Sequence, residues 1–121
     1  YYLLFRRIMA NSFINKKVDL TTTDQTTLYT VPSATTAIVK SILVSDDSGS
    51  GSTITIEIST PADATFNVAH QKVIAANTPT EILTNPLVVE TSEIVKVTAG
   101  HANRLHVLLS AMEVLPRTVT T

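Results

Sequence analysis

The chain has 121 residues and no cysteine, which suits one domain of ordinary size and excludes a disulfide framework or thiolate chemistry. Nine Lys and Arg stand against ten Asp and Glu, so there is neither a basic footprint for nucleic acid nor an acidic tail. Charged residues make up 16% of the chain, against about a quarter in ordinary domains. We therefore expect other subunits to cover part of the surface.

Residue usage favours β-structure throughout. Thr supplies about one residue in six and Trp is absent, so the core must come from Ile, Val and Leu. Thr is β-branched and favours strands, whereas the helix-forming residues Glu, Lys and Gln never cluster. These facts predict an all-β domain.

The chain begins with YYLLFRRI, followed by Met9-Ala10, which looks like a natural start. The first eight residues do not fit a signal peptide, because the apolar run is short, the Arg pair follows it and no processing site comes next. We expect residues 1–17 to form an N-terminal arm. No window reaches the length that crosses a bilayer.

The first strands are predicted at 12–20, as an entering arm or edge strand, and at 26–31, where Pro32 closes the strand. Residues 36–45 are apolar on both faces, with Ile38, Ile42 and Val44 predicted on one face and Val39 and Leu43 on the other. This pattern indicates a central strand that is covered on both sides, or one that a neighbouring subunit covers.

Residues 52–59 alternate cleanly, which predicts that Ile54, Ile56 and Ile58 point inward. Residues 65–75 predict a strand with a bulge, since Val73 is out of phase with Phe66 and Val68. Gly100 is expected at positive φ in a hairpin turn over 100–103. The remaining strand signals cover residues 81–83, 87–89, 93–99, with Val95 and Val97 inward, and 104–115, with Leu105, Val107 and Leu109 on one face.

About eight strands and no helical period predict a single-domain antiparallel β-sandwich, Ig-like or jelly-roll-like, with a small barrel as the alternative. We place the sandwich at residues 18–115, after the arm at 1–17, with a C-terminal tail at 116–121. The sequence shows no internal repeat or linker.

The patch SDDSGSGS at 45–52 resembles a ligand site because Asp46 and Asp47 offer carboxylates to a cation such as Ca²⁺. It lacks EF-hand spacing, and adjacent carboxylates on an extended chain point in opposite directions. A phosphate-binding loop would need Gly-Lys-Ser/Thr opening a helix. We interpret the patch as a hairpin turn, with Gly49 and Gly51 supplying unusual backbone angles.

Other chemistry finds little support. His70, His101 and His106 have neither cysteine nor H-x-x-x-H spacing beside them, and no G-x-S-x-G elbow is present. We therefore predict no catalytic, cofactor-binding or metal-binding residues, no cofactor and no enzymatic activity. Most of the possible acids are expected at outward strand positions or near turns: Glu57, Glu81, Glu90, Glu93 and Glu113.

Binding to nucleic acid or carbohydrate is also disfavoured. The basic clusters FRR at 5–7 and NKK at 15–17 lack an aromatic stacking platform. Carbohydrate binding favours exposed Trp or Tyr, and only Tyr29 lies in the body of the chain.

Several segments resemble small virion structural proteins of tailed bacteriophages, of the marine-phage type. The resemblance spans residues 18–115 and rests on TLYTVP at 27–32, AIVKSI at 37–42, TITIEI at 53–58, NPLVVE at 85–90, IVKVTA at 94–99 and MEV at 112–114.

The resemblance implies a multi-copy, non-enzymatic particle component, assembled in the host cytoplasm and located in the virion. Its expected partners are the major capsid protein or other virion proteins, with homo-oligomers and without nucleic acid or membrane. A capsid decoration or cement protein is the leading hypothesis. The alternatives are a neck, collar or tail component and a surface carbohydrate- or receptor-binding module.

Overall fold

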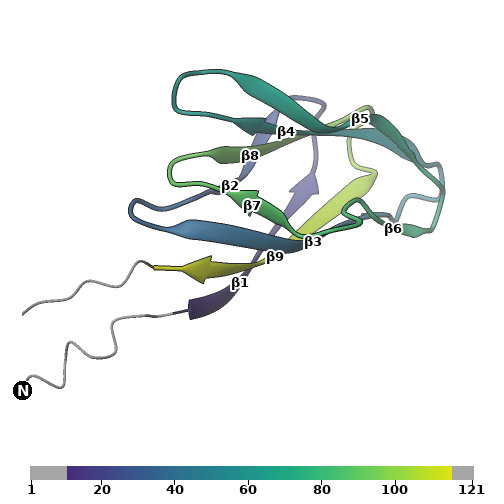
Figure 1. Ribbon diagram of the computed structural model, residues 1–121. Helices are drawn as coiled ribbons and strands as arrows, with labels where there is room; N and C mark the ends of the chain where they lie inside the picture. The colour runs from purple at the N-terminus through teal and green to yellow at the C-terminus, as the bar shows by residue number, and fades with distance from the viewer. Residues whose placement is uncertain (1–10, 116–121) are drawn as a thin grey trace, which may run out of the picture.

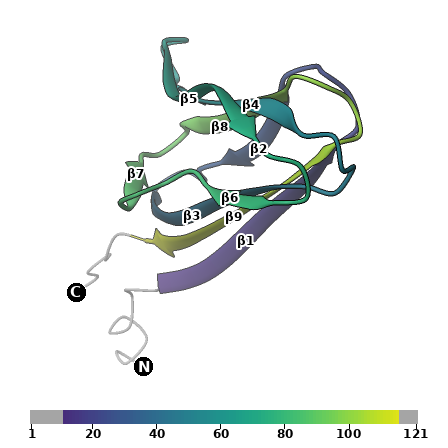
Figure 2. The same cartoon turned by 90° about the vertical axis from the view of Figure 1, so that its right-hand side faces the viewer.

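A computed structural model describes residues 11–115, which form two antiparallel sheets packed face to face (Figures 1 and 2). Across sheet A the order is β1 (Asn11–Leu20), β9 (Leu105–Val114), β3 (Thr36–Asp46), and then β6 (Pro79–Glu81) and β7 (Leu87–Val89), which both pair with β3. Across sheet B the order is β2 (Thr26–Thr30), β8 (Ile94–Ala99), β4 (Ser52–Ser59) and β5 (Thr65–Ile74). The predicted all-β sandwich is confirmed, with nine strands rather than about eight.

The core lies between the inner faces of the two sheets, as alternation predicts for a sandwich. Ile54 and Ile56 are fully buried and Ile58 nearly so, which confirms the predicted inner face of β4. The predicted inner residues of β8 and β9 are fully buried as well: Val95, Val97, Leu105, Val107 and Leu109. No helix among the described residues is long and apolar enough to span a membrane.

The face prediction for β3 is wrong over its first half. Its pairing with β9 shifts between Val39 and Ser41, so Lys40 is an extra residue in a bulge. Before the bulge the inner residue is therefore Val39, which is fully buried, while Ile38 is partly exposed on the outer face. Strict period-two counting cannot detect such an insertion, because it reverses every face assignment on one side.

The two glycine-containing connections are also not hairpins. Residues 47–51 lead from β3 in sheet A to β4 in sheet B, and residues 100–104 lead from β8 in sheet B to β9 in sheet A. Gly49 and Gly51 have the expected positive φ, of 83° and 73°. Gly100 does not, and the positive φ of the second connection belongs to Asn103, at 59°.

The structure departs from the expected boundaries at the N-terminal arm and at β6. Residues 11–17, assigned from the sequence to the arm, form the first part of β1 and pair with β9, so the predicted boundary at residue 18 lies inside a strand. β6 begins at Pro79 rather than residue 81. The bulge predicted in β5 is confirmed by register shifts against β4. Residues 1–10 of the arm and the tail at 116–121 lie outside the described residues.

Candidate functional site

The SDDSGSGS patch is organised around the carboxylate of Asp46, the last residue of β3. Only 4% of Asp46 is exposed, and it accepts hydrogen bonds from the Ser48 hydroxyl at 2.6 Å and from the Ser48 amide at 3.2 Å. The amides of Gly49 and Gly51, each at 3.1 Å, and of Asn77, at 3.0 Å, also donate to it. The Ser48 hydroxyl is the main reason that the pKa of Asp46 lies far below its ordinary value, and the amides add to this against the opposing effect of burial.

Hydrogen bonds from the chain itself use the acceptor sites of the Asp46 carboxylate. A carboxylate has about four lone-pair sites, and five donor contacts already occupy those of Asp46. Gly51 is required here, because a Cβ would lie 2.9 Å from the carbonyl oxygen of Ile74. Asp46 therefore fastens the β3–β4 connection to the loop after β5 and is not free to bind a cation. The sequence signal for this role is an Asp followed two residues later by Ser and then by Gly.

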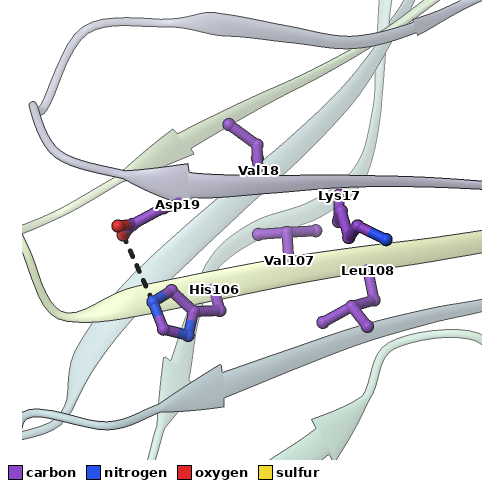
Figure 3. A pocket seen from close by; sticks show the side chains of 6 residues that line it. All are labelled: Lys17, Val18, Asp19, His106, Val107 and Leu108. Carbon is purple, nitrogen blue, oxygen red and sulfur yellow. Dashed lines mark ion pairs between the residues drawn. The ribbon is translucent and has the colours of Figure 1, made fainter.

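Asp47 points elsewhere, toward His106 on the outer face of β9. His106 Nε2 lies 3.3 Å from Asp19 Oδ1 and 3.6 Å from Asp47 Oδ2. Figure 3 shows the Asp19–His106 pair at the end of a hollow of about 260 Å³ that β1 and β9 line. All three side chains are substantially exposed, so this cluster lacks the burial that tunes catalytic groups.

The remaining histidines lie apart from this cluster. His70 is exposed in β5, the edge strand of sheet B, and His101 Nδ1 lies 3.0 Å from the Ser52 hydroxyl. Residues 11–115 contain no group of three or more His, Cys, Asp or Glu side chains placed to hold a metal ion.

The contact between Ser52 and His101 was not predicted from the sequence. It pairs a serine with a histidine, as the first two residues of a hydrolytic triad are paired. A triad also needs an acid that orients the imidazole. Both ion pairs of the described residues involve His106 instead. Ser52 is moreover almost buried at the start of β4 rather than exposed on a strained elbow. We therefore assign this pair a structural role at the turn between the sheets.

One predicted outward carboxylate points inward instead. Glu113 in β9 accepts a hydrogen bond of 2.5 Å from the hydroxyl of Tyr29 in β2. This bond links sheet A to sheet B. Burial of Tyr29, and then the neighbouring Glu113, raises the pKa of the phenol above its ordinary value. The predicted outward position of Glu113 is thus wrong, because Glu113 follows the inward phase of Leu109 and Ala111.

The outer face of sheet A carries exposed apolar side chains. The ribbons show no other described element lying over this face (Figures 1 and 2). Phe13 is 78% exposed and Val88 is 58% exposed. Strand register places them in one line across four strands, which we call the apolar row: Phe13, Met112, Ile38 and Val88. The sequence indicated that β3 is apolar on both faces. It could not indicate this row, because the row depends on the order of the strands in the sheet.

Comparisons with known proteins bear mainly on the fold. No model of a known protein family matches the sequence, and no curated protein matches it either.

Two solved structures resemble the sandwich. A chain in the structure of infectious bursal disease virus, Gx strain, matches over 88% of this chain with a TM-score of 0.51 and 15% identity. This chain spans 30% of that viral chain. A chain of the cyanophage Pam1 capsid asymmetric unit matches over 89% of this chain and 85% of its own length, with a TM-score of 0.41 and 18% identity. At such low identity the first likeness shows that the two chains share a β-sandwich fold.

Proposed function

We propose that this protein is a non-enzymatic structural component of a bacteriophage particle, and specifically a capsid decoration or cement protein. The observation that carries the proposal is the apolar row on the outer face of sheet A, which residues 11–115 leave open to a neighbouring molecule in an assembly. Monomeric proteins rarely leave contiguous apolar surface exposed unless another molecule covers it. The low charge content supports the same reading.

Three further observations support a role in a virus particle. The sequence resembles small virion proteins of tailed phages over residues 18–115. The sandwich fold also occurs in a chain of a virus structure. Among residues 11–115, the titratable groups are either fastened within the fold, like Asp46, or exposed, like His106. Such a domain works through the surfaces that it presents.

The mechanism that we propose is stabilisation linked to binding. A protein that binds an assembled shell more tightly than its free subunits stabilises the shell by mass action. Symmetric shells offer many equivalent sites for one small rigid domain. Each bound copy would cover a joint between capsid subunits and oppose their separation under internal pressure.

Copy number in purified particles tests this proposal. Quantitative mass spectrometry against the major capsid protein is expected to give on the order of hundreds of copies for a shell decoration. Roughly six to a few dozen copies would place the protein in the neck or tail instead. Particles lacking the protein should release their genome at lower temperature, and added protein should reverse the loss. Absence of the protein from particles would reject the virion role altogether.

A further inference from the structure

We infer that the outer face of sheet A binds a second copy of this chain, face to face, around a two-fold axis that runs parallel to the strands between β9 and β3. This inference concerns the free protein and does not depend on a role in a virus particle. It rests on the order of residues across the face, on charge complementarity and on the area available.

Strand register orders the outer face into rows that cross the sheet. The apolar row lies at one end, and Asp19, His106 and Ser45 form a polar row at the other end. Between them Lys17, Leu108, Leu43 and Glu81 lie in register across β1, β9, β3 and β6. Each row therefore runs from the β1 edge of the sheet to the β6 and β7 edge.

These rows select one orientation for a second copy. An axis perpendicular to the strands would place the apolar row against the charged groups of the polar row. An axis parallel to the strands keeps each row against its own counterpart and exchanges its two edges. Phe13 then faces Val88 of the second copy, while Met112 faces Ile38 and Leu108 faces Leu43.

Charge is complementary in this orientation. Lys17 at the β1 edge then faces the Glu81 carboxylate of the second copy. Within its own chain Glu81 accepts hydrogen bonds from the Ser41 hydroxyl, from the Ile42 amide at 2.8 Å and from the Leu83 amide at 3.2 Å. A carboxylate has about four lone-pair sites, so one acceptor position is left for the incoming ammonium group.

Polar groups in the middle of the face are compatible with the contact. Asn15 pairs in register with Ser110, which pairs with Ser41. The exposed Lys40 borders, with Phe13, Asn15 and Ser110, a hollow of about 270 Å³. These side chains can exchange hydrogen bonds across a two-fold axis, and the long stem of Lys40 can carry its ammonium group to solvent.

The area is sufficient for a specific interface. β1, β9 and β3 are ten or eleven residues long, so the face measures about 34 Å along the strands and about 19 Å across four of them. That is roughly 650 Å² for each copy and 1,300 Å² in total, within the range of about 1,200–2,000 Å² for stable interfaces. Stacked sheets of two copies would form a layer like the core of a sandwich.

Charge-complementing variants test both the dimer and its axis. Sedimentation velocity of the wild-type protein at micromolar concentration is expected to give twice the protomer mass of 13.0 kDa. Phe13→Lys and Val88→Glu should each weaken self-association by at least about tenfold, because two apolar contacts per dimer lose their partners. Mixing the two variants should restore dimers, since the new Lys and Glu then face each other and the second Phe13–Val88 contact is intact.

Val73→Glu is the matched control, because Val73 is 71% exposed on β5 of the other sheet. It should leave association unchanged. Native mass spectrometry would identify the restored species as the heterodimer. If either variant fails to fold, Leu108→Lys mixed with Leu43→Glu asks the same question. The inference would be overturned if the wild-type protein stays monomeric. It would also be overturned if the mixed variants form no more dimer than each variant forms alone.

Discussion

The two faces of sheet A both carry apolar side chains, yet contacts among residues 11–115 account for only one of them. On the inner face, Val39, Ile42 and Leu109 are fully buried against sheet B. On the outer face, Phe13, Met112 and Ile38 lie in register across β1, β9 and β3, and no other element of residues 11–115 covers them. The inner face holds the two sheets together, whereas the outer face has apolar area that the described part of the chain leaves unburied.

The sharpest test of this comparison uses two neighbouring leucines of β9. Leu109 is fully buried, and Leu108 is 39% exposed on the outer face. Leu109→Ala should lower the free energy of unfolding by about 2–5 kcal/mol, because it leaves a cavity in the core. Leu108→Ala should lower protomer stability by less than about 1 kcal/mol.

Urea denaturation at high dilution, where dimers dissociate, measures both values. Equal losses for the two variants would contradict the assignment of the faces. A much larger loss at Leu108 would mean that the outer face is covered within one chain.

The fold was largely predictable from sequence, for a physical reason. Alternation of apolar and polar residues in 52–59 and 104–115 predicts which side of each strand is buried. The isoleucines of the first strand and Leu105, Val107 and Leu109 of the second are buried as predicted. The β3 bulge at Lys40 could not be read in this way, because an inserted residue becomes visible only when the strands are paired. The inward side of Glu113 does follow from alternation with Leu109 and Ala111, but its hydrogen-bond partner Tyr29 is a tertiary feature that no local pattern gives. The apolar row requires strand order, which no local pattern encodes.

Asp46 is the buried last residue of β3, so replacing it should lower the stability of the single chain. Asp46→Asn replaces an acceptor-only carboxylate that receives five donor contacts with an amide whose NH₂ cannot accept. We expect the thermal midpoint to fall by roughly 5–10 °C. Asp47→Asn, on the exposed neighbour, should change it little. Similar losses for both would contradict the structural role assigned to Asp46.

Acid sensitivity should follow from the same carboxylate. The folded pKa of Asp46 is depressed, so its contribution to stability is present above the unfolded value of about 3.9 and is lost as pH falls below it toward the folded value. The free energy of unfolding should thus decline in wild type below about pH 4, and less steeply in Asp46→Asn. Urea titrations of both proteins over this range compare the slopes; parallel curves would refute the assignment.

Tyr29→Phe tests the hydrogen bond that links the two sheets, for which we expect a smaller loss of stability. The change removes the hydroxyl that donates to Glu113 and leaves a partly buried carboxylate without this donor. We expect a loss of about 1–2 kcal/mol. The double variant Tyr29→Phe with Glu113→Gln should recover part of it, since no charge then lies unpaired. A neutral single variant would show that water replaces the hydroxyl.

The smallest effect is expected at the exposed ion pair of the outer face. Asp19 and His106 are both largely open to solvent at a separation of 3.3 Å, and such pairs contribute about 0–1 kcal/mol. Asp19→Asn should therefore change unfolding free energy by less than about 0.5 kcal/mol at pH 6, and added salt should erase the difference. A loss comparable to that of Leu109→Ala would mean that this end of the outer face stabilises the single chain. The inner face would then not be the only face of sheet A that stabilises the described domain, because the polar end of the outer face would do so as well.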